Sequence, residues 1–194
     1  MRTFLLATAN EGKLREFNHA FAPLKMRFLS LKDFPAAPQV EETGATYQEN
    51  ARLKARALAV FTGLPAVADD SGIEIDALPG ELGVTSARYA AGRPYAEVNA
   101  EILRRLEGAQ TRACRYVCAL AFFDSATGRE ETATGAVEGV VHDRQEGDQG
   151  FGYDPIFFVP EYGKTMAQLP LEIKNRVSHR ARAIEQLMAL LEGR

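Results

Sequence analysis

The order of apolar patterns along the chain constrains the fold more than any other feature of the sequence. In the first part, short apolar runs typical of buried strands alternate with stretches whose apolar residues recur at helical spacing. Later, two long stretches rich in Tyr, Val, Phe and Thr follow one another, which is typical of consecutive strands. We therefore expect an α/β protein with a mixed central sheet flanked by helices, not a purely doubly wound parallel sheet.

The same patterns predict where the elements lie. Strands are expected at residues 4–9, 27–31, 64–68, 112–123 and 131–142, and residues 73–78 alternate apolar and acidic side chains. Helices are expected at residues 11–21, 46–62, 94–106 and 178–194. The last helix has the clearest signal, because Ser178 is a suitable N-cap and an apolar stripe from Ile184 to Leu191 follows it.

Composition narrows the class of protein. The chain has 194 residues, of which 25% are charged, and 23 Lys and Arg nearly balance 26 Asp and Glu. These values suit one soluble domain spanning residues 1–194, and the lack of a basic excess argues against nucleic acid as a partner. No stretch approaches the roughly 20 apolar residues of a membrane span, and the apolar run at residues 4–6 is too short for an export signal. We expect a cytoplasmic protein with no membrane partner.

The two cysteines, Cys114 and Cys118, fall on one expected strand. Extended chain of this length separates their Cα atoms by roughly 13 Å, whereas a disulfide needs about 4.4–6.8 Å. We expect both to be free thiols of the core. With only three histidines in the chain, a structural zinc site is not expected either.

The first candidate site is the segment 8–13, Thr-Ala-Asn-Glu-Gly-Lys, where the first expected helix begins. Asn10 is a suitable N-cap, which places Lys13 in the first turn, at the positive end of the helix dipole. A cation is unfavourable there unless an anion lies between it and the backbone N–H groups, as in phosphate sites at helix N-termini. The segment is not a Walker A loop, because Ala7 and Leu14 stand where that loop has glycine and Ser or Thr. The alternative is a capped helix with a surface lysine.

The second candidate is acidic. Asp69 and Asp70, followed by Ser71 and Gly72, come directly after an apolar run, and open α/β sheets bind ligands at the carboxyl ends of their strands. Adjacent carboxylates repel one another unless a cation compensates them, and Mg²⁺ suits an oxygen site completed by phosphate and water. The alternative is an Asp-rich turn capped by its own side chains. Residues 41–42, two glutamates before a glycine, are ordinary solvated acids unless a metal at Asp70 recruits them.

Two further segments suit a nucleobase. Residues 151–157 interleave aromatic side chains with glycine, which can form a platform on which a base stacks, or else a packed loop. Cationic groups gather around the start of the last helix, where they oppose the helix dipole. These groups are Lys174, Arg176, His179, Arg180 and Arg182. They favour an anionic or carbonyl-rich ligand over an ordinary basic surface.

Together these segments resemble one family, the inosine triphosphate pyrophosphatases, which hydrolyse non-standard purine nucleoside triphosphates such as ITP, dITP and XTP. The resemblance runs nearly end to end, in the family's order. Its landmarks are TANEGKLRE at 8–16, EETGATYQENA at 41–51, ADDSGIEIDAL at 68–78, SARY at 86–89, FGYDPIF at 151–157 and SHR at 178–180. The resemblance implies a twisted mixed sheet, two lobes with a cleft between them, a homodimer, and Mg²⁺-dependent release of pyrophosphate that leaves the monophosphate.

The resemblance also implies roles for particular residues. The phosphates would be held by Thr8, Ala9, Asn10, Glu11, Gly12 and Lys13. Asp70 would bind Mg²⁺ and act as general base, Ser71 would touch substrate beside it, and Glu41, Glu42 or both would complete the metal site. The base and its 6-oxo group would be enclosed by Phe151, Gly152, Tyr153, Asp154, Lys174, His179 and Arg180. Ala9, where the family usually has glycine, is a departure within the phosphate segment; Leu82 and Thr85 are departures at positions without an implied role.

Two other functions remain open at the level of sequence. One is a related pyrophosphatase that acts on modified pyrimidine nucleotides. The other is a regulator that binds ITP without hydrolysing it. The presence of Lys13 together with the acidic set argues against the regulator, because binding alone requires no arrangement of a metal and a base.

Overall fold

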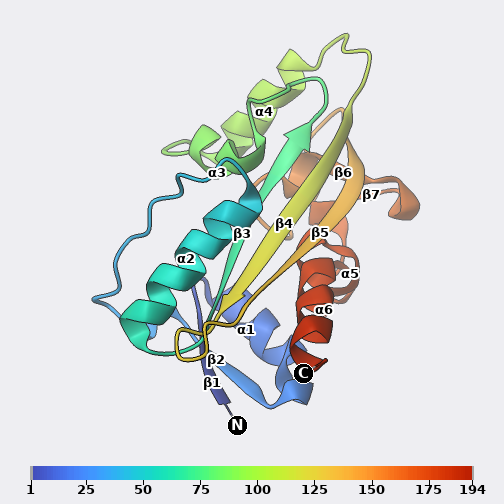
Figure 1. The fold of residues 1–194 in the computed structure, drawn as a ribbon. Coiled ribbons are helices and arrows are strands. Elements are labelled where there is room, and N and C mark those ends of the chain that lie inside the picture. Colours follow the sequence, from blue (N-terminus) through green and yellow to red (C-terminus); the bar gives the residue numbers. More distant parts are fainter. Residues whose placement is uncertain (1, 194) are drawn as a thin grey trace. The chain divides into compact units, whose positions relative to one another are not determined.

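A computed structural model describes residues 2–193. In this range seven strands form one sheet in the order β2-β1-β3-β4-β5-β6-β7 (Figure 1). The strands are β1 Arg2–Leu6, β2 Met26–Leu29, β3 Ala66–Ile75, β4 Ala113–Phe123, β5 Glu130–Val141, β6 Phe157–Val159 and β7 Lys164–Thr165. β1 pairs in parallel with β2 and β3, whereas β6 pairs antiparallel with β5 and β7. The expected mixed sheet is confirmed.

The α-helices in the described part of the chain are α1 Glu11–Ala20, α2 Tyr47–Thr62, α3 Ser86–Tyr89, α4 Tyr95–Arg105, α5 Leu171–Val177 and α6 His179–Glu192. The expected caps are confirmed: Asn10 Oδ1 accepts hydrogen bonds from the backbone N–H groups of Gly12 and Lys13, and Ser178 Oγ accepts one from that of Ala181. No helix in this range is both long enough and apolar enough to span a membrane.

The strand β3 differs most from the sequence prediction, and β1 ends at Leu6 rather than at residue 9. Residues 64–68 were expected as a short strand that ends before an acidic turn, but β3 continues through Asp69 and Asp70 to Ile75. The alternative prediction of an Asp-rich turn at these residues is therefore wrong. From the sequence, the end of this strand is ambiguous because Asp69 and Asp70 interrupt the apolar run. The structure resolves it, since side chains of α1 and α2 contact both carboxylates. The short elements α3, α5, β6 and β7 lack sufficient periodicity to be predicted.

The chain divides into two compact units, in line with the two expected lobes. The first unit contains the residues up to Asp70, Cys118–Gly135 and the residues from Arg182 onward; the second contains Ser71–Val117 and Ala136–Ala181. The expected cleft stays a prediction.

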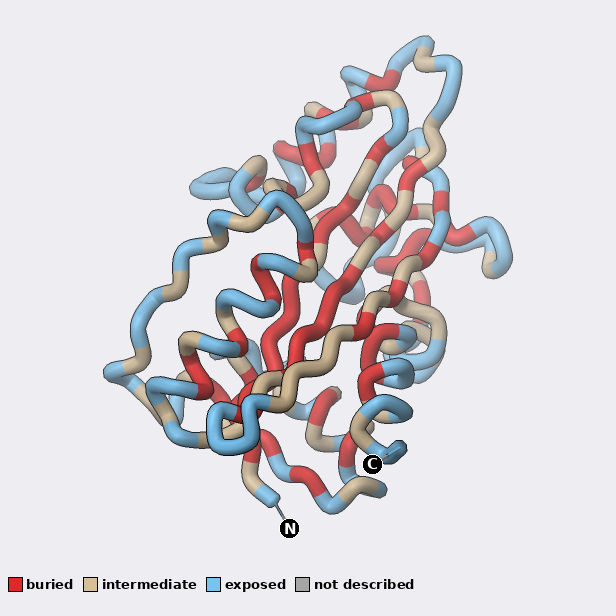
Figure 2. Tube along the Cα trace, in the orientation of Figure 1, coloured by how far each residue is buried: buried red, intermediate tan, exposed pale blue. Residues whose placement is uncertain are grey.

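In the first unit, helices cover both faces of the strands. Because side chains alternate along a strand, Val67 of β3 faces a core that includes Phe17 of α1 and Leu187 of α6. Ala68, the next residue, faces the alanines of α2 instead. Figure 1 shows α2 on one side of these strands and α1 and α6 on the other, and Figure 2 shows the buried residues concentrated along the strands between them.

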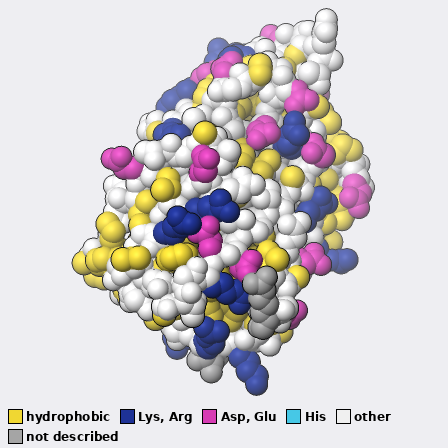
Figure 3. Space-filling view, in the orientation of Figure 1, with side chains coloured by type: hydrophobic (Ala, Val, Ile, Leu, Met, Phe, Trp, Pro, Cys, Tyr) yellow, Lys and Arg dark blue, Asp and Glu magenta, His cyan; other side chains and the backbone are white. Residues whose placement is uncertain are grey.

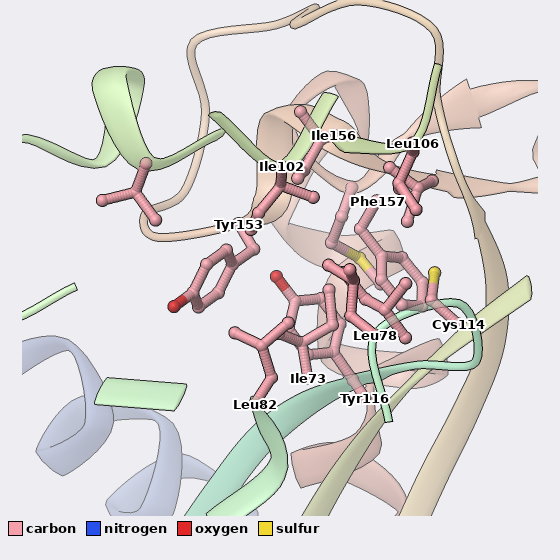
Figure 4. Packing of buried hydrophobic residues seen from close by; sticks show 14 of the residues in the cluster. Ile73, Leu78, Leu82, Ile102, Leu106, Cys114, Tyr116, Tyr153, Ile156 and Phe157 are labelled. Atoms are coloured by element: carbon pink, nitrogen blue, oxygen red, sulfur yellow. The ribbon is translucent and has the colours of Figure 1, made fainter. Parts of the chain in front are cut away.

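The second unit has a core of its own. Ile73 of β3 and Ile102 of α4 pack there with residues of β4 and β6, among them Tyr116 and Phe157, whose rings stack with centroids 4.3 Å apart (Figure 4). Cys114 belongs to this core, and burial raises the pKa of its thiol to about 12. Cys114 and Cys118 are both buried thiols, as expected.

The parallel pairing of β1 and β3 places two of the candidate segments beside one another in the first unit. The backbone N–H of Ala7 donates to the carbonyl of Val67 at 2.8 Å, so the chain leaves β1 next to Val67 of β3. The segment that leads into α1 therefore begins beside Asp69 and Asp70, which lie within β3 as that strand continues to Ile75.

Candidate active site

The segment at the start of α1 forms a capped turn. The backbone N–H of Asn10 donates to Thr8 Oγ1 at 3.2 Å, and Asn10 Oδ1 caps Gly12 and Lys13. A Cβ on Gly12 would lie 3.0 Å from Asn10 Oδ1, so glycine suits this tight position. Because Asn10 already accepts from two N–H groups of the first turn, an anion here relies chiefly on the helix dipole and on the Lys13 side chain.

Lys13 is held against the acidic pair. Its Nζ lies 2.7 Å from Asp69 Oδ2, and the Asp69 side chain is only 5% exposed. The sequence predicts a role for Asp70 but none for Asp69. Strand alternation supplies the missing signal, since Asp69 shares a face with Val67, and that face packs against α1.

Asp70 lies on the other face of β3, toward α2. Its Oδ2 accepts a hydrogen bond from Asn50 Nδ2 at 3.0 Å, and its Oδ1 lies 3.9 Å from Lys54 Nζ. Burial raises the pKa of the Asp70 carboxyl, the bond from Asn50 and the charge of Lys54 oppose this rise, and the charge of Glu42 adds to it. Asn50 and Lys54 are four residues apart on α2, so they present to one side of the helix.

Asn50 also connects Asp70 to the loop that contains Glu41, Glu42 and Gly44. Its Oδ1 accepts a hydrogen bond from the backbone N–H of Gly44 at 2.8 Å. A Cβ on Gly44 would approach Glu49 Cβ to 2.6 Å, which requires glycine at this point. Asn50 was not predicted, although its spacing from Lys54 along the amphipathic helix is a signal that reasoning from the sequence could have used.

The two glutamates of that loop differ in their surroundings. Glu42 is half-buried, and its Oε1 lies 2.5 Å from Lys54 Nζ, the same ammonium that approaches Asp70. Glu41 is exposed. Lys54 therefore links Glu42 to Asp70, and the structure gives Glu41 no comparable position.

A divalent cation is compatible with these groups. Within residues 2–193, no cluster of three or more His, Cys, Asp and Glu side chains is arranged to hold a metal ion. Asp70 and Glu42 nevertheless share one positive charge, that of Lys54, and both offer carboxylate oxygens. Mg²⁺ is commonly held by one or two carboxylates together with substrate phosphates and water, so this pair fits a metal that arrives with its substrate.

In the second unit, Asp154 organises the segment that was expected to meet the base. Its Oδ2 accepts from Lys174 Nζ at 2.8 Å, and its Oδ1 accepts from the Tyr116 hydroxyl at 3.2 Å. Gly150 has φ +101°, and a Cβ there would lie 2.1 Å from Asp154 Oδ2 and 2.4 Å from Lys174 Nζ. Only glycine permits this close approach.

The aromatic residues of this segment lie in different environments. Tyr153 is buried, donates its hydroxyl to the Ser86 carbonyl at 2.6 Å and packs edge-on against Tyr95. Phe151 is 65% exposed and is thus accessible to a ligand. Between them, Gly152 has φ +68°, and its carbonyl accepts from Asn99 Nδ2 at 3.0 Å.

The basic residues near α6 also separate into two groups. Arg180 is only 8% exposed, and the His179 ring stacks on Tyr116 with centroids 4.8 Å apart. Arg176 and Arg182 are exposed. The remaining predicted residues are Ser71, which is half-buried beside Asp70, the exposed Ala9, and Glu11, which pairs with Lys32.

Comparisons with known proteins agree with the resemblance found in the motifs. Residues 4–190 match the Ham1 family. The dITP/XTP pyrophosphatase of Listeria monocytogenes serotype 4b (strain F2365) is 47% identical over 192 residues, which cover 96% of this chain and 93% of the relative. That of Geobacter sulfurreducens is 48% identical over 190 residues, covering 96% and 95%.

Solved structures agree as well. A HAM1 protein from Coxiella burnetii superposes with a TM-score of 0.92 at 39% identity and covers 100% of both chains. The Ham1 protein of Staphylococcus aureus gives 0.90 at 38% identity, covering 99% of both chains. The chain belongs to the Ham1 family.

Proposed function

We propose that this protein is a nucleoside triphosphate pyrophosphatase that hydrolyses non-standard purine nucleoside triphosphates, such as dITP, XTP and ITP, to the monophosphate and pyrophosphate. Relatives that it matches over nearly their full length carry the name dITP/XTP pyrophosphatase. The structural observation that carries the proposal is the pair of adjacent, buried carboxylates in β3, each approached by a lysine. Carboxylates suit a metal ion and lysines suit phosphate groups, so this arrangement fits a triphosphate with a bound metal.

Binding of the triphosphate is assigned to the start of α1. Thr8, Asn10 and Gly12 form the turn, and the helix dipole and Lys13 supply positive charge. An arriving phosphate competes with Asp69 for Lys13. Because Lys13 is then paired with the phosphates, it stabilises the charge that develops on the leaving pyrophosphate.

Mg²⁺, when bound, neutralises phosphate charge and polarises the reacting phosphorus. Asp70 and Glu42 are the residues that we assign to hold it, since Lys54 lies against both carboxylates. Asp70 also orients the attacking water and takes its proton. Asn50 fixes the Asp70 carboxylate through one hydrogen bond, and Lys54 limits the repulsion between the two acids.

Selection of the base is assigned to residues of the second unit. Lys174, His179 and Arg180 are donors suited to a 6-oxo group, and the exposed ring of Phe151 suits stacking on a purine. The 6-amino group of adenine would leave such donors unpaired, which disfavours ATP strongly.

We further infer that residues 1–194 act as one catalytic domain, as a homodimer, in the cytoplasm, on free nucleotides rather than on nucleic acid or membranes. Positive and negative side chains are interspersed on the face shown in Figure 3, which supports a free nucleotide rather than nucleic acid as the substrate.

Pyrophosphate release across a nucleotide panel, with Mg²⁺ and with chelator, tests this function. We expect release from dITP, ITP and XTP that requires the metal, and little from ATP. A preference for modified pyrimidine nucleotides would favour the related pyrimidine enzyme. Tight ITP binding without pyrophosphate release in excess Mg²⁺ would favour a regulator.

A further inference from the structure

Tyr116 is a core residue of the second unit to which the motifs assign no role. It lies in β4 and is only 7% exposed. Its ring stacks on those of Phe157 and His179, with interplanar angles of 20° in both cases. Figure 4 shows it within the hydrophobic cluster beside Phe157. Tyr116 therefore joins the core to His179, one of the residues assigned to the base.

The hydroxyl of Tyr116 forms a hydrogen bond with one of the residues assigned to the base. It donates to Asp154 Oδ1 at 3.2 Å, while Lys174 Nζ occupies Asp154 Oδ2 at 2.8 Å. Asp154 Oδ2 also accepts from the backbone N–H of Phe151 at 3.4 Å, so donors on both oxygens leave the carboxylate little freedom to rotate. Burial and the neighbouring Asp154 charge raise the pKa of Tyr116 well above its usual value, so the hydroxyl keeps its proton and remains a donor.

An apolar ring would suit this position better if packing were the only requirement. A buried hydroxyl is costly unless it is hydrogen-bonded, and phenylalanine would fill nearly the same volume without needing a partner. The hydroxyl is thus explained by its hydrogen bond to Asp154 and not by packing in the core. The ring fills space in the core and also supports His179 by stacking on it.

We propose that Tyr116 is a positioning residue for purine recognition, which sets the orientation of the Asp154–Lys174 pair through its hydroxyl and that of His179 through its ring. This inference rests on the proposed function, in which those three residues enclose the base. Tyr116 acts through them, and we assign it no part in the cleavage step.

Its removal should change substrate binding more than the chemical step. A hydrogen bond to a charged group contributes enough that its loss weakens binding by about tenfold. We expect Tyr116→Phe to raise the KM for ITP by about tenfold with kcat within about twofold, and to lower the ITP-over-ATP ratio of kcat/KM by about the same factor as KM rises. Tyr162→Phe, which removes a hydroxyl from a half-buried tyrosine of the same unit, is the matched control and should leave both parameters unchanged.

A double-mutant cycle tests whether Tyr116 acts through Asp154. Kinetics are compared for the wild type, Tyr116→Phe, Asp154→Asn and the double variant. We expect the double variant to be no worse than Asp154→Asn alone, because the hydroxyl has then already lost its charged partner. Losses that add across the two sites would overturn the proposal, as would a decrease in kcat for ITP and ATP alike with unchanged KM, which is the result of a purely structural role.

Equilibrium binding of IMP without metal separates this inference from the proposed function. We expect Tyr116→Phe to raise the Kd for IMP by about tenfold, whether or not any triphosphate is hydrolysed. Normal hydrolysis of ITP by the wild type with an unchanged Kd in the variant would overturn the inference alone. IMP binding with the expected change but no pyrophosphate release would overturn the proposed function alone, and a wild type that neither binds IMP nor releases pyrophosphate from ITP would contradict both.

Discussion

Lys13 forms its ion pair with Asp69, at 2.7 Å, and not with the neighbouring Asp70. Successive side chains of β3 point to opposite faces, so α1 supplies a cation to the first carboxylate and α2 supplies one to the second. The two acids therefore do not share one lysine. We assign them different tasks, with Asp69 positioning Lys13 and Asp70 serving the metal and the attacking water.

Replacement of Lys13 should lower both activity and stability, and a second substitution should restore only the stability. Lys13→Met removes the phosphate contact that we propose, which should lower kcat by about 100-fold or more. It also leaves the buried Asp69 carboxylate without its lysine, at a cost of about 1–3 kcal/mol in the free energy of unfolding. Adding Asp69→Asn should restore most of the stability and none of the activity, as judged by denaturant unfolding and pyrophosphate release. Recovery of activity in the double variant would show that Lys13 serves only as a counter-ion. Arg15→Ala, an exposed cation of the same helix, is the control.

Asp70→Asn should abolish turnover without harming the fold. Burial raises the pKa of Asp70, which means that the folded protein holds this carboxylate at a cost when it is ionised. The cost is present above the folded pKa and disappears as the pH falls below it. The variant should therefore have an unfolding temperature equal to or above that of the wild type at pH 7, and the difference should shrink toward acidic pH. Near-normal turnover, measured as pyrophosphate release, would exclude the assigned role.

The two glutamates before Gly44 provide a matched pair. Glu42→Gln should raise the Mg²⁺ concentration needed for half-maximal activity by about tenfold or more, because Glu42 lies against Lys54 together with Asp70. Glu41→Gln, a change of the same size at an exposed neighbour, should have little effect. Titration of activity with Mg²⁺ checks both variants. A larger effect at Glu41 would reverse the assignment.

Arg180 is the basic residue near α6 that is most suited to reading the base, because it is buried whereas Arg182 is exposed. Arg180→Ala should lower kcat/KM for ITP by about 10–100-fold and lower the preference for ITP over ATP. The unfolding temperature should fall much less than activity. Arg182→Ala is the control on the same helix. Unchanged selectivity in the Arg180 variant would remove Arg180 from base recognition.

Much of the fold could be predicted from the sequence, because the spacing of apolar residues indicates which face of a helix or strand is buried. Helices α1, α2, α4 and α6 were predictable from 3.6-residue periodicity, and Asn10 and Ser178 were predictable as N-caps, which the structure confirms. The extent of β3 was not, since Asp69 and Asp70 read as the end of a strand when their partners on α1 and α2 are unknown. Short elements such as β7 are determined by tertiary contacts and leave no period to detect.

The candidate site shows the same limit. Motifs locate Lys13, Asp70 and Asp154, but the residues that hold them come from elsewhere in the chain. Asn50, Lys54 and Tyr116 lie on ordinary amphipathic or apolar stretches, and their roles appear only when hydrogen bonds and ion pairs are known. A motif identifies the chemistry, whereas tertiary structure is needed to identify what positions it.

Identification of the products formed from ITP tests the central claim most directly. Incubation with ITP and Mg²⁺, followed by ³¹P NMR of the products, distinguishes attack at the α-phosphorus from attack at the γ-phosphorus. The account predicts IMP and pyrophosphate in equal amounts, formed by the wild type and absent with Asp70→Asn. Formation of IDP and orthophosphate, or equal product formation by the Asp70→Asn variant, would contradict it.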